Sequence, residues 1–126
     1  MLKPKRLSLG LTATGLLLAA SVAGAQSLNL YTARHYDSDQ ALYDAFEAQT
    51  GIEVNILQGG ADQLIERIER EGAASPADVL MTVDAGLLNR AERAGVFASV
   101  DSSTLQQRIP AALRHPDDLW FGFSER

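Results

Sequence analysis

The sequence contains no cysteine, and it is poor in proline, aromatic residues and lysine. The absence of cysteine excludes disulfide bonds and thiolate metal sites. Lys3 and Lys5 are the only lysines, so every basic residue after Arg6 is an arginine. The formal net charge is −5. An acidic chain without a basic patch predicts that neither nucleic acid nor an anionic membrane is a partner.

The sequence also lacks the short motifs of several large enzyme classes. It has no G-x-S-x-G nucleophile elbow, no H-E-x-x-H helix and no G-x-x-x-x-G-K-[ST] phosphate loop. Without cysteine, nucleophilic catalysis would require a hydroxyl or a carboxylate. We therefore predict that the protein is not an enzyme.

The first 25 residues have the three parts of a secretory signal peptide. A basic start at residues 3–6 precedes a short apolar run at 7–22, and an A-x-A-like cleavage site ends at Ala25. A membrane anchor is the alternative, but the run is short for a bilayer span and rich in small residues. We predict export to the periplasm with cleavage after Ala25. Cleavage would remove three basic residues and no acidic one, which takes the formal net charge from −5 to −8.

From residue 26 onward, strand and helix patterns alternate. The periodicity predicts strands at 28–32, 52–57, 78–83 and 119–123, and helices at 37–50, 61–71, 84–94 and, less regularly, 101–109. The continuous apolar run of Val79, Leu80 and Met81 predicts that the strand at 78–83 is buried on both faces. Successive strand–helix units predict an α/β fold with a mostly parallel sheet flanked by helices.

Local signals set the expected ends of these helices. Asp37 and Gln40 have the spacing of a capping box, and Gly51 is placed to end the first helix. The expected apolar stripe of the first helix consists of Leu42, Tyr43 and Phe46. Asp84 is expected to cap the third helix rather than to bind a ligand.

His35 and Tyr36 lie on the predicted turn between the first strand and the first helix. Ligands of open α/β sheets bind in the crevice outside the carboxyl ends of the strands. An imidazole and a phenol side by side at such a turn suggest a metal site, with a solvated turn as the alternative. Tyr31 and Tyr43 are expected in the core, and His115 on a surface loop.

Five stretches resemble the N-terminal part of the periplasmic ferric-iron-binding proteins of ABC transporters, which have the type II periplasmic binding protein fold. They are LYTARHY at 30–36, FEAQTGIEV at 46–54, DQLIERI at 62–68, SPADVL at 75–80 and WFGFS at 120–124. F-x-x-x-T-G-I is common among type II binding proteins, whereas the R-H-Y turn combined with S-P-A-D-V is more specific. Members of the family are much longer and hold iron between two lobes. The resemblance therefore implies that residues 26–126 are a partial N-terminal lobe, that the second lobe is absent and that the chain is truncated.

The resemblance also implies roles for single residues. His35 matches an iron-ligand position of some members, and Tyr36 matches a ligand position of the tyrosine-rich members. Where other members have a glutamate, this sequence has Val83, which points to the tyrosine-rich subgroup. Arg34 matches a position near the metal or its accompanying anion.

The implied function is that of a solute-binding component of an ABC importer, a monomer that captures Fe(III) in the periplasm and delivers it to a membrane permease. Whether a synergistic anion accompanies the iron stays open. Hard Fe(III) suits phenolate oxygen, and because a free phenol has a pKa near ~10, binding should release a proton. The alternatives are a binding protein for an oxyanion or a small organic solute, such as a phosphonate or a polyamine, and a nonfunctional remnant.

Overall fold

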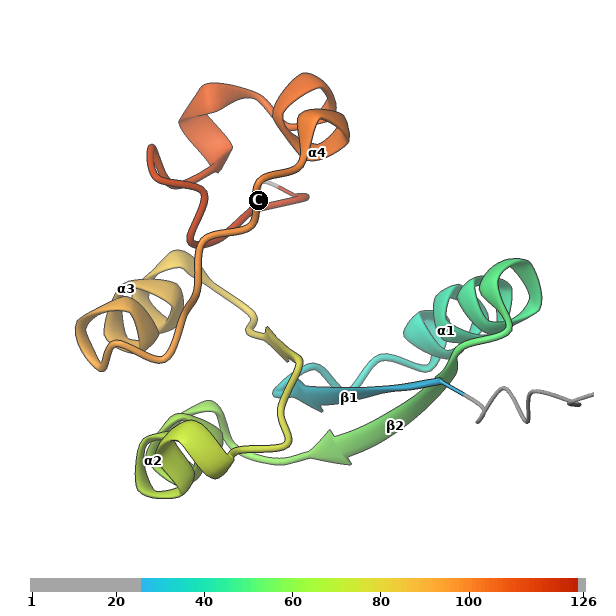
Figure 1. The fold of residues 1–126 in the computed structure, drawn as a ribbon, viewed down its shortest axis with the longest axis horizontal. Coiled ribbons are helices and arrows are strands. Elements are labelled where there is room, and N and C mark those ends of the chain that lie inside the picture. The colour runs from blue at the N-terminus through green and yellow to red at the C-terminus, as the bar shows by residue number, and fades with distance from the viewer. Residues whose placement is uncertain (1–25, 125–126) are drawn as a thin grey trace, which may run out of the picture.

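Strands and helices alternate along residues 26–124, the part of the chain that the computed structural model describes (Figure 1). The predicted signal peptide and its cleavage site after Ala25 lie outside the described residues. The elements in order are β1 (Ser27–Thr32), α1 (Asp37–Thr50), β2 (Glu53–Gln58), α2 (Ala61–Glu71), the 3-10 turn η1 (Gly72–Ala74), β3 (Val79–Met81), α3 (Ala85–Arg93), α4 (Ser103–Arg108) and the 3-10 turn η2 (Ala111–Leu113). Within this range, none of the helices has the length and apolar character needed to cross a bilayer.

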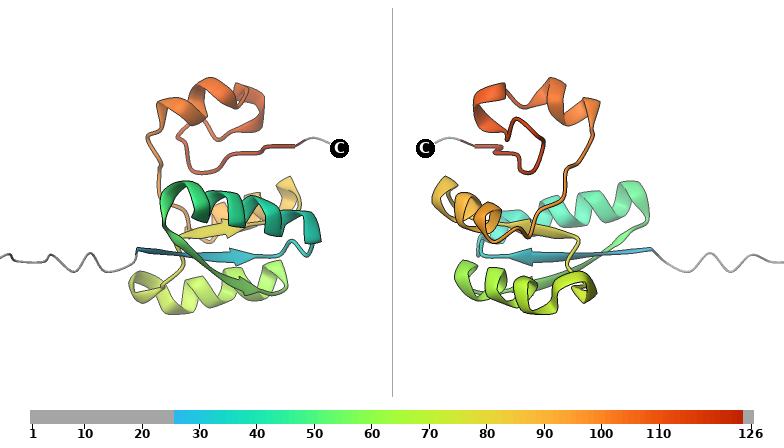
Figure 2. Two further views of the ribbon diagram at one scale, coloured as in Figure 1. Left: turned by 90° about the vertical axis from the view of Figure 1, so that its right-hand side faces the viewer. Right: turned by 60° about the vertical axis from the view of Figure 1, so that its left-hand side comes forward.

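The strands of the described residues form a parallel sheet with the order β2-β1-β3. Tyr31 at the centre lies opposite Leu57 of β2 and Leu80 of β3. Figure 2 shows α1 on one face of this sheet and α2 on the other, with the C-terminal segment on the α1 side. The predicted α/β fold with a parallel sheet flanked by helices is confirmed.

The core gathers around the second half of β1. Leu30, Tyr31 and Thr32 are successive residues, and all are buried, with exposed fractions of 3%, 4% and 1%. Burial of consecutive residues is expected for a central parallel strand that is covered on both faces. The helices contribute Tyr43, Leu64, Ile65 and Ala91. The carboxyl end of β1 is therefore held from both faces and both edges.

Helix α1 ends as predicted but begins differently. Gly51 has a left-handed φ of 72°, and its N–H donates to the Glu47 carbonyl oxygen at 2.8 Å, as in helices that end at glycine. The predicted capping box is wrong, because Asp37 is the first helical residue and Tyr36 occupies the N-cap position. The Gln40 side chain donates instead to Asp44 Oδ1 at 2.8 Å.

The expected apolar stripe of α1 is only partly buried. Tyr43 is 8% exposed, whereas Leu42 is 58% exposed. Neighbouring positions on a helix point about 100° apart, so burial of Tyr43 against the sheet directs Leu42 to the side. The stripe is therefore narrower than the sequence indicated.

The third predicted strand is shorter and less buried than expected. β3 covers only Val79–Met81, and Val79 is 40% exposed. The reason is that β3 is an edge of the described sheet and pairs there with β1 alone. An apolar run indicates a strand but does not show on how many sides the strand is covered.

The predicted strand at 119–123 is wrong. Phe121 makes an isolated antiparallel bridge with Arg114, and the Gly122 N–H donates to the Leu113 carbonyl oxygen at 2.6 Å. The backbone hydrogen bonds of this segment thus go to the preceding loop rather than to the sheet. The segment is an irregular hairpin on the α1 side.

Candidate functional site

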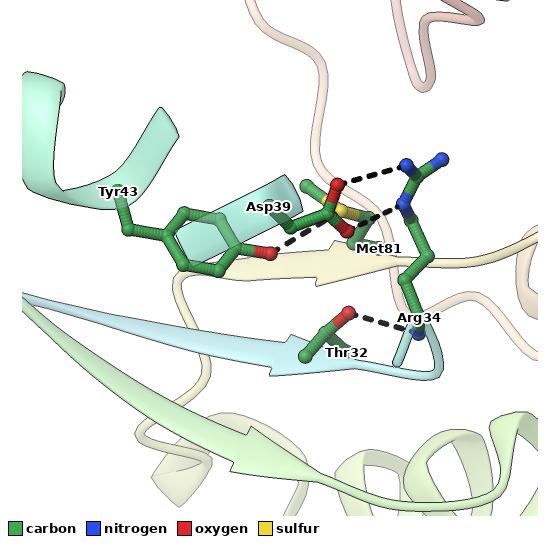
Figure 3. Close-up of polar contacts among 5 residues, drawn as sticks. All are labelled: Thr32, Arg34, Asp39, Tyr43 and Met81. Atoms are coloured by element: carbon green, nitrogen blue, oxygen red, sulfur yellow. Dashed lines mark hydrogen bonds and ion pairs between the residues drawn. The ribbon is translucent and has the colours of Figure 1, made fainter. Parts of the chain in front are cut away.

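The turn at residues 33–36 leads from the carboxyl end of β1 into α1. The Ala33 N–H donates to the Met81 carbonyl oxygen of β3 at 2.9 Å. The Arg34 N–H donates to Thr32 Oγ1 at 3.0 Å, a bond that Figure 3 shows. Thr32 itself is buried. These two bonds fix the start of the turn, so the residues that follow have a defined position at the carboxyl ends of the strands.

The two predicted metal ligands lie next to each other at the end of this turn. His35 is exposed, and Tyr36 has an exposed fraction of 48%. Both side chains are therefore accessible to a solute. Across residues 26–124, no group of three or more His, Asp or Glu side chains is placed to hold a metal ion.

Arg34, the residue before this pair, is held by an acidic partner from α1. Its Nε and Nη2 atoms donate to Asp39 Oδ2 and Oδ1 at 2.9 and 3.0 Å (Figure 3). The side chains of Arg34 and Asp39 are only 18% and 13% exposed. Two parallel N–H···O bonds match the planar guanidinium to the carboxylate and fix its orientation. The sequence did not predict this pair, because a separation of five residues across a turn is not a helix spacing.

Tyr43 lies close to the site but faces the core. Its hydroxyl donates to Met81 Sδ at 3.8 Å (Figure 3), and the residue is buried. Burial raises the pKa of the Tyr43 phenol, and the carboxylate of Asp39 adds to this rise. A phenol of raised pKa stays neutral at ordinary pH, so Tyr43 is suited to packing rather than to supplying a phenolate. This confirms the sequence prediction that it is a core residue.

A sequence profile of bacterial extracellular solute-binding proteins matches residues 31–126, which is more than half of the chain. The chain belongs to this family.

Similar proteins of known sequence or structure make the family assignment more specific. The chain is 54% identical to iron uptake protein A2 of Synechocystis sp. over 93% of this chain and 34% of the relative. It is 34% identical to the Fe(3+)-binding periplasmic protein of Serratia marcescens over 92% of this chain and 35% of the relative. A Trichodesmium protein, solved in complex with iron and citrate ligands, superposes with a TM-score of 0.75 at 61% identity, over 78% of this chain and 31% of that chain.

These comparisons confirm the resemblance to ferric-iron-binding proteins that the sequence motifs indicated. Neither of the relatives' names describes an enzyme. The chain spans about a third of the length of the curated relatives that it matches, at 34% and 35%.

In this solute-binding protein the turn after β3 supplies a helix cap. Asp84 Oδ1 accepts a hydrogen bond from the Leu87 N–H at 2.9 Å, which satisfies one of the unpaired donors at the start of α3. This confirms the predicted capping role of Asp84. The preceding residue, Val83, is 38% exposed, and its side chain carries no donor atom for a metal.

His115 lies in a loop, as predicted, but its side chain is less exposed than a surface loop position implies. The side chain of His115 is only 14% exposed, and its Nε2 atom lies 3.3 Å from Glu92 Oε1. Glu92 also accepts a hydrogen bond from Trp120 Nε1 at 2.8 Å. This cluster could not be predicted from local patterns, because it joins α3 to residues more than twenty positions away along the chain. The cluster fastens the C-terminal hairpin to α3 in this solute-binding protein.

The Arg34–Asp39 pair should make part of the stability of the fold depend on pH. The hydrogen bonds from Arg34 hold the pKa of Asp39 below its usual range, and the charge of Arg34 adds to this effect. A depressed folded-state pKa stabilises the fold above the unfolded value of about 3.9, and the contribution is lost as pH falls through the folded value. We expect Asp39→Asn to be less stable than the wild type by a constant amount down to about pH 4, with the difference closing at lower pH.

Urea unfolding at a series of pH values measures this difference. In an Arg34→Met background, the same Asp39→Asn change should lose most of its pH dependence, because the charged partner is gone. A difference that stays constant to the lowest pH at which the wild type folds would contradict the assignment of the pair as the cause.

Proposed function

We propose that this chain is part of a periplasmic binding protein that captures ferric iron and delivers it to the permease of an ABC importer. The single observation that carries this proposal is the accessible His35–Tyr36 pair at the carboxyl end of the central strand. The 61% identity to a protein solved with iron and citrate supports it.

The chemistry of the pair fits this cargo. Ferric iron is a small, hard cation that prefers anionic oxygen, and imidazole is also a suitable ligand for iron. Tyr36 would supply a phenolate, which forms when the metal displaces the phenolic proton. His35 would bind as the neutral imidazole, and its protonation would weaken binding in acid.

The remaining features of the proposal concern the rest of the chain. Residues 1–25 would direct export and be removed after Ala25, and residues 26–126 would form part of the N-terminal lobe of a two-lobe, monomeric binding protein. N-terminal sequencing of protein recovered from the periplasm tests the first point. A sequence beginning at Gln26 is expected, and an intact Met1 would contradict it.

A graft tests the iron assignment. Residues 27–124 of this chain would replace the matching segment of the Trichodesmium protein, so that the remaining part of that protein can close over the turn. Addition of ferric citrate should produce a visible phenolate-to-iron absorption and raise the melting temperature, because a ligand that binds only the folded state stabilises it.

Citrate alone, a phosphonate and a polyamine serve as controls in the same graft. They should produce no visible absorption and a smaller rise in melting temperature. A folded graft that is stabilised by the phosphonate or the polyamine, and that stays colourless with ferric citrate, would overturn the proposal in favour of a binding protein for an oxyanion or an organic solute.

A further inference from the structure

Arg34 lies within cation–π range of two aromatic rings. Its guanidinium carbon is 4.9 Å from the ring centre of Tyr36 and 5.7 Å from that of Phe123. Tyr36 belongs to the turn after the central strand β1, whereas Phe123 belongs to the C-terminal hairpin. The guanidinium therefore lies between the turn at 33–36 and the C-terminal hairpin.

The guanidinium is also hydrogen-bonded to a residue of α1. Both oxygens of Asp39 accept hydrogen bonds from it. The Asp39 N–H in turn donates to the Tyr36 carbonyl oxygen at 3.0 Å. The backbone of Tyr36 and the side chain of Arg34 are thus both tied to the same residue in the first turn of α1. A cation anchored in this way presents a fixed face to the Tyr36 ring.

We propose that Arg34 is a positioning residue that holds the Tyr36 ring in one orientation, so that the phenol is presented to the ferric ion without a search among rotamers. This inference rests on the proposed function, because it assigns the orientation a use in iron binding. It differs from a direct role of Arg34 at an anion, since Nε and Nη2 already donate to Asp39.

The expected size of the effect follows from the exposure of the site. Cation–π attraction at a partly exposed tyrosine is modest and corresponds to a preference of roughly two- to fivefold for the stacked orientation. A tyrosine side chain otherwise divides among staggered χ1 positions. Loss of the guanidinium should therefore redistribute the Tyr36 rotamers by this factor and lower ferric affinity by a similar one.

The chain contains a matched control for such an experiment. The Arg67 guanidinium carbon lies 5.5 Å from the ring centre of Tyr31, and Arg67 Nε donates to Glu71 Oε1 at 2.7 Å. This is the same combination of an arginine, a carboxylate and a tyrosine ring, but on α2 and away from residues 33–36. Arg67→Met removes an equivalent guanidinium without touching the turn.

The first measurement needs no iron. In this chain without the graft, the Hα–Hβ couplings of Tyr36, measured by NMR, report its χ1 angle. We expect the couplings of a single dominant χ1 rotamer in the wild type, couplings that move toward rotamer-averaged values in Arg34→Met, and a smaller movement in Arg34→Lys, which keeps the charge but loses the planar fork. Asp39→Asn should also move them, and Arg67→Met should not. Wild-type couplings retained in a folded Arg34→Met or Asp39→Asn variant would overturn the inference.

The second measurement adds ferric citrate to the graft with the same substitutions. Arg34→Met should weaken ferric binding by the same roughly two- to fivefold and change the phenolate-to-iron absorption, whereas Arg67→Met should alter neither. Unchanged affinity and absorption in Arg34→Met would overturn the use of the orientation in iron binding. If a Tyr36→Phe graft bound iron as tightly as the unmodified one, the proposed function would be wrong, while the coupling measurement would still decide whether Arg34 orients the ring.

Discussion

Tyr36→Phe should reduce the visible phenolate-to-iron absorption of the graft and weaken its ferric binding strongly. The substitution deletes the oxygen donor but keeps the ring, so the contact with Arg34 at 4.9 Å is preserved. Loss of an outer-shell partner already costs roughly 10- to 100-fold in metal affinity, and loss of a direct ligand should cost at least as much. The fold should be unaffected, because the side chain is 48% exposed.

Two companion variants make this result specific to Tyr36. Tyr43→Phe removes a buried hydroxyl that donates to Met81 and should leave both absorption and affinity nearly unchanged. His35→Ala should weaken binding less than Tyr36→Phe if phenolate oxygen dominates the attraction for ferric iron. Titration with ferric citrate compares the three. Equal affinity and equal absorption in Tyr36→Phe and the unmodified graft would mean that the R-H-Y turn has only a structural role.

Ile65→Ala should produce a large loss of stability. Ile65 has an exposed fraction of 0%, and it belongs to α2, which packs against β1. Truncation of a buried isoleucine to alanine removes apolar contacts and leaves a cavity, at a cost of about 2–5 kcal/mol. Since small domains are stable by only about 5–15 kcal/mol, this loss is a large share of the total.

Leu42→Ala is the matched control for this core substitution. Leu42 is 58% exposed on α1, and exposed substitutions away from special features usually change stability by about 0.5 kcal/mol or less. Urea unfolding of this chain measures both variants, provided that the dependence of the unfolding free energy on urea concentration is the same in both. A loss in Leu42→Ala as large as that in Ile65→Ala would show that α1 buries a wider face than its side-chain exposure indicates.

Much of the fold could be predicted from local patterns. β1, α1 and α2 carry clear periodicities, and glycines follow α1 and flank α2. The bounds of all three elements lie within one residue of the predictions. The predictions failed where a distant segment decides the outcome. The apolar side chain of Val79 is typical of a strand, but its exposed fraction depends on whether another segment covers the outer edge of β3. Trp120 and Phe121 look like strand residues, but their segment bonds to its own preceding loop.

The candidate site was predictable only in part. His35 and Tyr36 could be placed together because residues after a central parallel strand reach the carboxyl edge of the sheet. The anchoring of Arg34 by Asp39 could not, since it depends on the angle at which α1 leaves the turn. The approach of Phe123 to the same guanidinium could not be predicted either, because it depends on how the C-terminal hairpin folds back over the sheet.

At the N-cap of α1, the residue type that would stabilise the helix most differs from the tyrosine that the proposed function requires. Tyr36 has extended φ and ψ of −103° and 128° at this position, and its side chain makes no capping hydrogen bond. Serine, aspartate or asparagine at an N-cap commonly adds about 0.5–2 kcal/mol, and Asp37 and Asp39 in the first turn recover only part of this through the helix dipole. Selection for heat resistance alone should therefore replace this tyrosine early, and the selected variants would be more stable but would lack the phenol that we propose as an iron ligand.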